Sequence, residues 1–310
     1  MSFKLQFEKL QSKLDTRRAI LSLQREDKLK LVKTINLKRD KKTNYFDPKK
    51  IKRHKLTVEI GYGQMHDEQF DVFKVGEDSC TKDAILYFYD SHFVFRPALI
   101  EFDRAIKLNK ATGNDVYIPK YPLLPNYSIR DVVRVLFTAL KKVNKLGYEN
   151  IYLYGVGTGA TLAIETLVYN NEKEVSVPMP KRLILISPGG FPKNEKEWED
   201  MKAAQKMDYT TSLRHILEIK ELATLKNPSV PDYMITGENL NLNGFPESFF
   251  FYSDEEICYG KFDNYKEQFE EAGIKTQFTV RHGVLHNYCA DKKYPEAYED
   301  YDAIIELLKR

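Results

Sequence analysis

The sequence predicts an α/β protein built on a doubly wound, mostly parallel sheet with an antiparallel start. Short, unbroken apolar runs alternate along most of the chain with stretches whose apolar residues recur at helical spacing. The chain has 310 residues, of which 42% are hydrophobic and 13% aromatic. It is therefore long and apolar enough to bury the core of one large domain, which excludes wholesale disorder.

The predicted strands fall into two groups. Residues 55–63 and 68–75 are two short strands separated by a polar turn, which is typical of a hairpin. The later runs are continuous and β-prone, as expected for strands buried on both faces. They cover residues 84–89, 115–119, 150–155, 182–187, 248–252 and 276–280.

Helices are predicted between these strands. Ser128 and Asp131 have the spacing of a capping box, and the helix that follows them ends near Gly147. Residues 262–272 carry apolar residues on one face and are followed by Gly273. Pro295 begins the last predicted helix.

Two parts of the chain lie outside this alternation. Residues 1–55 begin with helical, Leu- and Lys-rich sequence and continue into a basic stretch at 38–55, which we interpret as a solvated connector rather than a phosphate or membrane contact. Residues 191–245 are polar and helical. We therefore expect an N-terminal helical cap segment with a basic connector, then one domain over 56–310 with a cap insertion near 191–245. Such an insertion would lie over the C-terminal edge of the sheet.

Composition excludes several classes of function. The charges, 48 Lys and Arg against 45 Asp and Glu, leave a net charge of +3, which does not favour a general nucleic-acid binder. The three cysteines, Cys80, Cys258 and Cys289, do not have the spacing of metal ligands. We therefore expect no disulfide scaffold and no metal or other cofactor. We also expect a cytoplasmic location, where thiols stay reduced. Scattered N-terminal charges do not resemble a signal peptide, and no apolar run reaches the ~20 residues of a membrane span.

The most informative segment is residues 150–167, where a strand ends at Gly155, a turn follows and a helix begins. Gly155, Gly157 and Ala160 match the dinucleotide fingerprint G-x-G-x-x-G/A. Gly155 and Gly159 also frame the nucleophile elbow G-x-S-x-G, with Gly157 where serine belongs.

Context favours the elbow. The dinucleotide motif belongs to the first strand of its domain and needs an acidic residue at the end of the next strand. Here several strands come first, and the next one ends in Ile186, Ser187 and Pro188. A structural turn without chemistry is the remaining alternative.

Taken together, residues 56–310 resemble the α/β-hydrolase fold, and within it the acetyl esterase or hormone-sensitive-lipase-like group. Five segments carry this resemblance in the same order as in the group: 115–136, 153–163, 182–190, 248–273 and 281–289. The resemblance implies an elbow in the second segment, an acid in the fourth and a histidine loop in the fifth.

The resemblance also assigns roles to single residues. His286 would be the catalytic base, with His282 as a less well placed competitor, and Glu256 would orient the base, with Asp254 as the alternative acid. The other interpretation of these residues is an ordinary loop histidine and solvated loop carboxylates.

Two parts of the catalytic machinery differ from the group. Gly157 has no side chain, so no acyl-enzyme can form there; loss of the serine costs roughly 10⁶-fold, or about 8 kcal/mol of barrier, in other triad hydrolases. The group's His-Gly-Gly-Gly loop corresponds here to residues 89–93, in which Asp90, Ser91 and His92 carry side chains where glycines let N–H groups reach an oxyanion. Thr158, after the elbow position, completes the expected oxyanion region.

We therefore expect a catalytically degenerate hydrolase relative that binds a small acyl or ester-like ligand or a protein partner. The alternative is a carboxylic-ester hydrolase with a displaced nucleophile, foremost Ser91, then Thr158, Cys258 or Cys289. A scaffolding protein whose N-terminal helices and basic segment 38–55 make the functional contact is a third interpretation, and an exposed apolar stripe on the N-terminal helix would favour it.

Overall fold

The computed structural model describes residues 2–14, 16–44, 56–65, 68–75, 81–174 and 176–309. In this part of the chain eight strands form one sheet in the order β1-β2-β4-β3-β5-β6-β7-β8. Their bounds are β1 Leu56–Met65, β2 Glu68–Val75, β3 Asp83–Phe88, β4 Asp115–Pro119, β5 Asn150–Val156, β6 Arg182–Ile186, β7 Glu247–Ser253 and β8 Thr276–Arg281.

The pairing confirms the predicted mixed sheet. β1 pairs antiparallel with β2, and β2 pairs antiparallel with β4. All later neighbours run parallel, so the carboxyl ends of β3, β5, β6, β7 and β8 meet at one edge of the sheet. The parallel strands are buried almost throughout, except β8 at the sheet edge.

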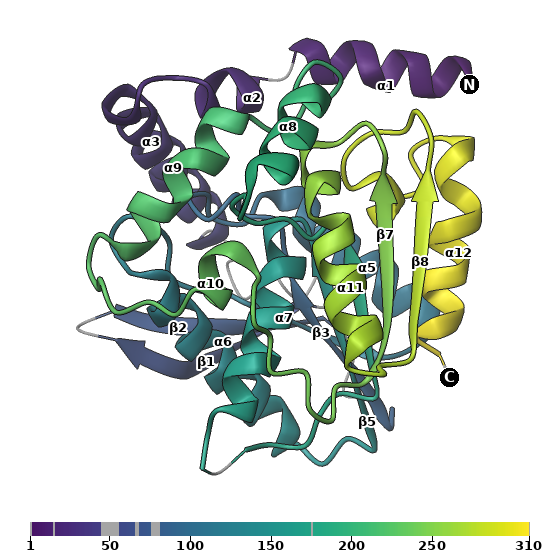
Figure 1. Cartoon of the computed structure of the whole chain (residues 1–310). Helices are drawn as coiled ribbons and strands as arrows, with labels where there is room; N and C mark the ends of the chain where they lie inside the picture. Colours follow the sequence, from purple (N-terminus) through teal and green to yellow (C-terminus); the bar gives the residue numbers. More distant parts are fainter. Residues whose placement is uncertain are drawn as a thin grey trace.

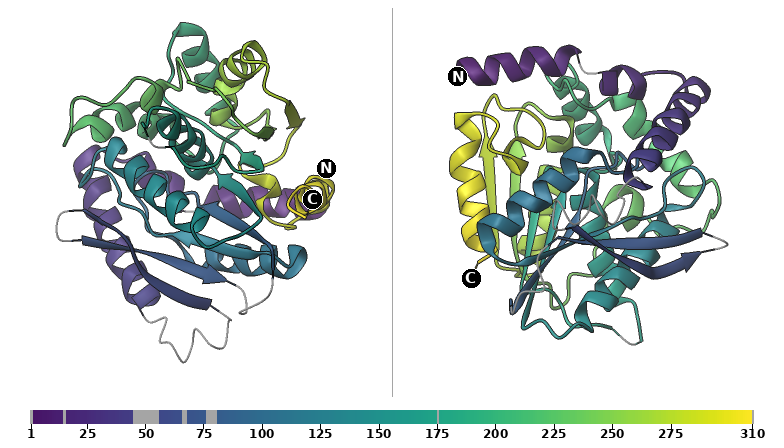
Figure 2. Two further views of the ribbon diagram at one scale, coloured as in Figure 1. Left: turned by 90° about the horizontal axis from the view of Figure 1, so that it is seen from below. Right: turned by 180° about the vertical axis from the view of Figure 1, so that it is seen from behind.

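Helices cover both faces of the sheet (Figures 1 and 2). α5 and α12 pack together on one face, and α6, α7 and α11 lie on the other. The helix bounds are α1 Phe3–Leu14, α2 Thr16–Leu21, α3 Arg25–Asn44, α5 Leu99–Thr112, α6 Ile129–Asn144, α7 Thr158–Asn171, α8 Glu195–Ala204, α9 Leu213–Thr224, α10 Tyr233–Thr236, α11 Phe262–Glu271 and α12 Tyr298–Leu307, with 3₁₀ turns η1 Ile257–Lys261, η2 Tyr288–Ala290 and η3 Pro295–Ala297.

Local signals place several of these helices. The Ser128 side chain accepts from the Asp131 N–H and the Asp131 side chain accepts from the Ser128 N–H, which is the expected capping box of α6. Gly273 follows α11 with φ 67°. Pro295 begins a 3₁₀ turn rather than the last α-helix itself, which starts at Tyr298.

The first part of the predicted basic connector is helical in the structure. Residues 38–44 continue α3, because Lys and Arg are good helix formers and this end of the helix is anchored. The Asn36 side chain pairs with the backbone at Val94 and Arg96, and the Arg39 guanidinium donates to the Arg96 carbonyl. The rest of the basic stretch, 45–55, and Cys80 lie outside the described residues.

The N-terminal helices lie beside the 191–245 insertion, at the end of the sheet toward which β7 and β8 point (Figure 1). Arg18 donates to the Gln205 carbonyl, and the hydroxyls of Ser22 and Ser212 lie 3.1 Å apart. The fully buried Lys28 ammonium pairs with Glu218 at 2.5 Å. Among the described helices, none has the length and apolar character needed to cross a membrane.

Candidate functional site

A sharp turn joins β5 to α7 at Gly157, whose backbone has φ 56° and ψ −124°. The Gly157 N–H donates to the Ile186 carbonyl at 2.8 Å. The flanking glycines are required by close packing: a Cβ at Gly159 would lie 2.1 Å from the Phe88 carbonyl oxygen, and one at Gly155 would lie 2.5 Å from Ala160 Cα. The strand, turn and helix expected of an elbow are therefore present.

The space in front of Gly157 is filled by Asp90. A Cβ built on Gly157 would lie 2.4 Å from Asp90 Cγ and 2.6 and 2.8 Å from its two carboxylate oxygens. Asp90 follows β3, and its side chain is only 3% exposed. A carboxylate from a neighbouring strand thus occupies the volume into which an elbow side chain would project.

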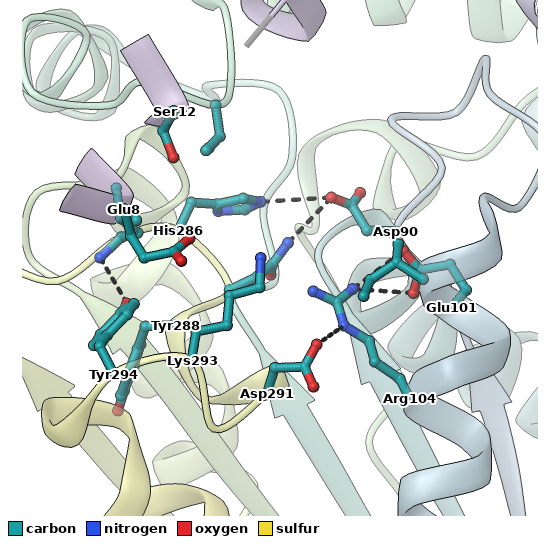
Figure 3. Close-up of a pocket in the computed structure, with 14 residues that line it drawn as sticks. Glu8, Ser12, Asp90, Glu101, Arg104, His286, Tyr288, Asp291, Lys293 and Tyr294 are labelled. Carbon is teal, nitrogen blue, oxygen red and sulfur yellow. Dashed lines mark hydrogen bonds and ion pairs between the residues drawn. The ribbon is translucent and has the colours of Figure 1, made fainter. Parts of the chain in front are cut away.

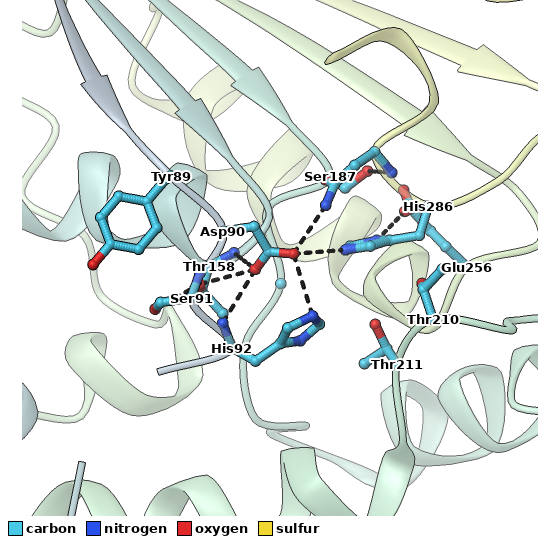
Figure 4. Close-up of polar contacts among 12 residues, drawn as sticks. Tyr89, Asp90, Ser91, His92, Thr158, Ser187, Thr210, Thr211, Glu256 and His286 are labelled. Carbon is cyan, nitrogen blue, oxygen red and sulfur yellow. Dashed lines mark hydrogen bonds and ion pairs between the residues drawn. The ribbon is translucent and has the colours of Figure 1, made fainter. Parts of the chain in front are cut away.

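One Asp90 oxygen is held by backbone N–H groups. Oδ1 accepts from the N–H of Thr158 and the N–H of His92, both at 3.2 Å, and from the Thr158 hydroxyl at 3.1 Å (Figure 4). These N–H groups lie where the resemblance puts the oxyanion hole. His92 and Phe93 keep left-handed φ values of 46° and 61° although neither is glycine. The loop therefore still presents a donor, and a carboxylate oxygen occupies the place of an oxyanion.

The other Asp90 oxygen faces the histidine loop. Oδ2 accepts from Asn287 Nδ2 at 3.1 Å and lies 3.3 Å from His92 Nε2 and 3.7 Å from His286 Nε2. The Asn287 backbone N–H donates to the Ser187 hydroxyl, which fixes the histidine loop against the end of β6. Asp90 therefore lies between the elbow and His286.

The two candidate acids, Glu256 and Asp254, contact different histidines. Glu256 Oε2 lies 2.6 Å from His286 Nδ1, and its other oxygen accepts from the Ser253 N–H. Asp254 instead contacts the exposed His282 ring at 2.7 Å and accepts from the Gly283 N–H. Of the two pairs, the structure brings Glu256 and His286 to the elbow and leaves Asp254 and His282 near the surface.

The charge state of His286 follows from its neighbours. Burial alone would lower the pKa of this imidazole, but its contacts with Asp90, Cys258 and Glu256 outweigh burial and raise the pKa well above its usual value. The neighbouring Asp90 and Glu256 carboxyl groups thus favour the protonated imidazolium form of His286, although burial also raises the pKa of Glu256. In this state it has no lone pair with which to accept a proton.

The alternative nucleophiles are poorly placed for serine-like chemistry. The buried Ser91 hydroxyl accepts from the Phe93 N–H and contacts the Thr158 hydroxyl, and Asp90 lies between Ser91 and His286 (Figure 4). Burial raises the pKa of the Cys258 thiol to about 11 and that of Cys289 well above its usual value. Both thiols are therefore protonated at neutral pH.

Two cavities border the pair of Asp90 and His286. The larger, about 140 Å³, is polar and lies beneath α1 (Figure 3). Its lining residues are Glu8, Ser12, Asp90, Ile100, Glu101, Arg104, Thr210, Leu285, His286, Asn287, Tyr288, Asp291, Lys293 and Tyr294. The smaller, about 30 Å³, has room for little more than water and includes Cys258 and His215 in its wall.

His215 and Asn287 are site residues that sequence reasoning missed. His215, on α9, is buried, and burial lowers its pKa to about 3, so its neutral ring contacts the His92 carbonyl through Nε2 at 2.8 Å. No motif marks it. Asn287 directly follows His286, and that adjacency was the one signal available. In the described part of the chain, no three His, Cys, Asp or Glu side chains form a group suited to a metal ion.

Comparison with known proteins places this geometry in context. A family model described as alpha/beta hydrolase fold matches residues 85–290. No curated protein sequence gives a significant match.

Solved structures match over nearly the whole chain. An esterase from the bacterial hormone-sensitive lipase (HSL) family has a TM-score of 0.76 at 17% identity and covers 100% of this chain and 98% of its own. A putative esterase from Staphylococcus aureus has a TM-score of 0.71 at 20% identity, and the match covers 95% of this chain and 94% of the esterase. A hyperthermophilic esterase from the archaeon Pyrobaculum calidifontis has a TM-score of 0.76 at 17% identity, and the match covers 100% of this chain and 98% of the esterase. At these identities the likeness shows the shared fold.

Proposed function

The chain belongs to the family described as alpha/beta hydrolase fold, and on that premise we propose that it is a relative of carboxylesterases and lipases that no longer hydrolyses esters through a serine. Its site is retained as a polar cavity that binds a small acyl or ester-like ligand. The proposal has two halves: ester hydrolysis is lost, and ligand binding is retained. Each half has its own test.

The observation that carries the first half is the position of the Asp90 carboxylate. Serine-dependent acyl transfer needs a nucleophile at the elbow and two empty N–H donors for the oxyanion. Gly157 supplies no nucleophile, and the N–H groups of Thr158 and His92 already bind Asp90 Oδ1. An ester carbonyl would have to displace a buried, hydrogen-bonded carboxylate to enter this site.

The charge on His286 also opposes ester hydrolysis. A general base must be unprotonated before it can activate a hydroxyl or a water. Asp90 and Glu256 both favour the protonated imidazole. Neither the contacts of Ser91 nor the ionisation of His286 therefore supports ester hydrolysis by a displaced nucleophile.

The cavity supports the second half. About 140 Å³ of space borders Asp90 and His286, and its wall carries both acidic and basic groups, including Glu8 from α1 and Lys293. Arg104 in the same wall is paired with Glu101 and Asp291. A small polar ligand that presents both a donor and an acceptor fits such a wall better than a long apolar chain does.

One observation favours the scaffolding interpretation instead. Phe3, Phe7 and Leu10 lie on one side of α1 at helical spacing and are 83%, 48% and 57% exposed. Such a stripe can pack against another apolar surface. Sedimentation of the wild-type chain beside a Phe7→Lys variant tests the self-association form of this idea, which requires a larger species that the variant loses.

Hydrolysis of p-nitrophenyl acetate tests the loss of esterase activity. We expect the wild-type chain to act no faster than a His286→Ala variant of the same fold, as judged by circular dichroism. Robust turnover that is abolished by Ser91→Ala or Cys258→Ala would overturn the proposal in favour of a displaced nucleophile.

Ligand binding is tested separately by calorimetric titration with 3-hydroxybutyrate and with ethyl 3-hydroxybutyrate, which present a hydroxyl donor as well as acceptor oxygens. Binding that is weakened by Lys293→Ala supports a ligand in the polar cavity. Absence of binding for both would remove the acyl-ligand half of the proposal and leave the esterase half standing.

A further inference from the structure

A further cavity lies between α3 and the segment that follows β4. Its volume is about 370 Å³, against about 140 Å³ for the polar cavity beneath α1. Its lining residues are Leu29, Val32, Lys33, Asn36, Leu37, Arg96, Leu123, Leu124, Pro125, Asn126 and Tyr127. None of these residues lines either of the two cavities at Asp90 and His286. The space is therefore a separate site, and its volume lies in the range of small-molecule pockets.

Two short stretches of sequence supply most of its wall. On α3 the lining positions 29, 32, 33, 36 and 37 are three, four and seven or eight residues apart, so their side chains share one face of the helix. The second stretch is residues 123–127, which directly follows the end of the β4 segment and is apolar at four of its five positions. The wall is thus mainly aliphatic, with a few polar groups among the apolar ones.

Hydrogen bonds hold the two parts of this wall apart. Asn36 Nδ2 donates to the Val94 carbonyl at 2.8 Å, and Asn36 Oδ1 accepts from the Arg96 N–H at 2.9 Å. The Leu124 N–H donates to the Phe93 carbonyl at 3.0 Å. Both parts are therefore fastened to the same segment, 93–96. Their separation is set through that segment, so the cavity is a built feature of the fold.

Burial and polarity are graded along the wall. Val32, Leu123 and Leu124 are 4%, 6% and 3% exposed. Lys33 and Asn126 are exposed. A molecule that enters from solvent thus meets an ammonium and an amide at the mouth and branched aliphatic side chains at the bottom. This gradient fits a ligand with one polar end and one apolar end.

The charge of the wall indicates the kind of polar end. Lys33 and Arg96 are cations, and no Asp or Glu is among the described residues that line the cavity. The Arg96 guanidinium already donates to the Tyr121 carbonyl at 3.2 Å, whereas Lys33 is exposed at the mouth. The Lys33 ammonium is therefore the group that an entering ligand meets, and it is complementary to a single negative charge.

We propose that this cavity binds an aliphatic carboxylate of medium chain length, with its carboxylate at Lys33 and its chain against Val32, Leu123 and Leu124. Removal of the chain from water drives binding, and the ion pair at the mouth sets the orientation. This inference goes beyond the proposed function, which concerns a small polar ligand in the cavity beneath α1.

Both ends of such a ligand contribute. Acetate carries the charge but leaves the aliphatic wall uncovered, so it buries little apolar surface. Octan-1-ol covers the wall but gives no ion pair with Lys33. Each should therefore bind more weakly than octanoate, which combines the two features.

Calorimetric titration of the intact chain with octanoate, below the concentration at which it forms micelles, tests the proposal. We expect saturable binding of one octanoate per chain. Lys33→Glu should weaken binding by about tenfold, because repulsion replaces a charge-assisted hydrogen bond. Lys30→Glu is the matched control. Lys30 is also exposed on α3, but it pairs with Asp27 and lies outside the wall, so this variant should bind octanoate like the wild type.

A second variant fills the cavity without altering its charge. Leu37 belongs to the wall and is 54% exposed, so a larger side chain there takes up cavity volume at a position where the core does not depend on close packing. Leu37→Trp should abolish octanoate binding and leave the circular dichroism spectrum unchanged.

Three results overturn the inference: no saturable binding of octanoate, equal affinities for Lys33→Glu and Lys30→Glu, or octan-1-ol binding as tightly as octanoate. Lys293→Ala separates the two cavities. Loss of octanoate binding in that variant would place the ligand beneath α1 and also contradict the inference. Each of these results leaves the p-nitrophenyl acetate and 3-hydroxybutyrate tests of the proposed function unaffected, because those tests concern the cavity at Asp90 and His286.

Discussion

The Asp90 carboxylate occupies the space into which a side chain at Gly157 would project: a Cβ on residue 157 would lie 2.4 Å from Asp90 Cγ. The glycine therefore does more than relieve strain at a turn with φ 56°. It leaves the volume that the carboxylate occupies. A serine at position 157 would collide with the Asp90 carboxyl group. The loss of the elbow serine and the presence of Asp90 in the oxyanion loop are therefore one structural feature.

Gly157→Ser alone should destabilise the protein and give no esterase activity. The new Cβ meets the Asp90 carboxyl group, and a non-glycine residue in this backbone conformation costs about 1–3 kcal/mol. Thermal unfolding should show a lower Tm, and p-nitrophenyl acetate turnover should stay at the wild-type level. An unchanged Tm would mean that the Asp90 side chain moves aside freely.

Gly159→Ala should be far more damaging than Gly113→Ala. At Gly159 the added Cβ would meet the Phe88 carbonyl oxygen at 2.1 Å, whereas at Gly113 nothing lies within 4 Å. Gly113 has φ 78°, so its substitution costs only the left-handed conformation, about 1–2 kcal/mol. Urea unfolding of both variants measures the difference. Similar losses at the two positions would contradict the close packing of the elbow against β3.

His286 should remain protonated at pH values where an ordinary histidine is neutral. Its pKa is raised in the folded state, so the stability that it contributes is fully present below the unfolded value of about 6.5 and is lost as the pH rises through the folded value. The difference in unfolding free energy between the wild type and His286→Gln should shrink as the pH rises above 6.5. Ring ¹⁵N shifts typical of a neutral imidazole at pH 7.5 would refute this.

Neutralising Asp90 should lower the pKa of His286. Asp90→Asn removes one of the two negative charges beside the ring and keeps the shape of the side chain. The same NMR titration should therefore show His286 losing its proton at a lower pH in the variant than in the wild type. Asp254→Asn is the matched control, because Asp254 contacts His282 and not His286. Equal titration curves for the wild type and Asp90→Asn would show that Glu256 alone sets the charge.

Much of the fold was predictable because its signals are local. The eight strands carry apolar runs, Ser128 and Asp131 carry a capping box, and glycines mark turns. The part of the basic stretch that continues α3 was missed, since its anchoring depends on contacts of Asn36 and Arg39 with distant backbone.

The site was predictable in its members and not in its arrangement. The elbow, Glu256 and His286 follow from motif order. The loop at Asp90 was expected to have a damaged oxyanion hole, yet its N–H donor persists and binds the Asp90 carboxylate. No sequence pattern shows that a side chain after β3 enters the space in front of a glycine after β5. Only the parallel pairing of those strands brings the two together.

The Asp90→Gly/Gly157→Ser double variant tests the central claim most directly. It empties the two N–H donors and supplies the missing hydroxyl, while Ser91 can stay because its hydroxyl supports the loop through the Phe93 N–H. For p-nitrophenyl acetate we predict that kcat/KM of the double variant exceeds the product of the effects of the two single changes. If Gly157→Ser alone reaches the same kcat/KM as the double variant, Asp90 does not block the site and the account is wrong.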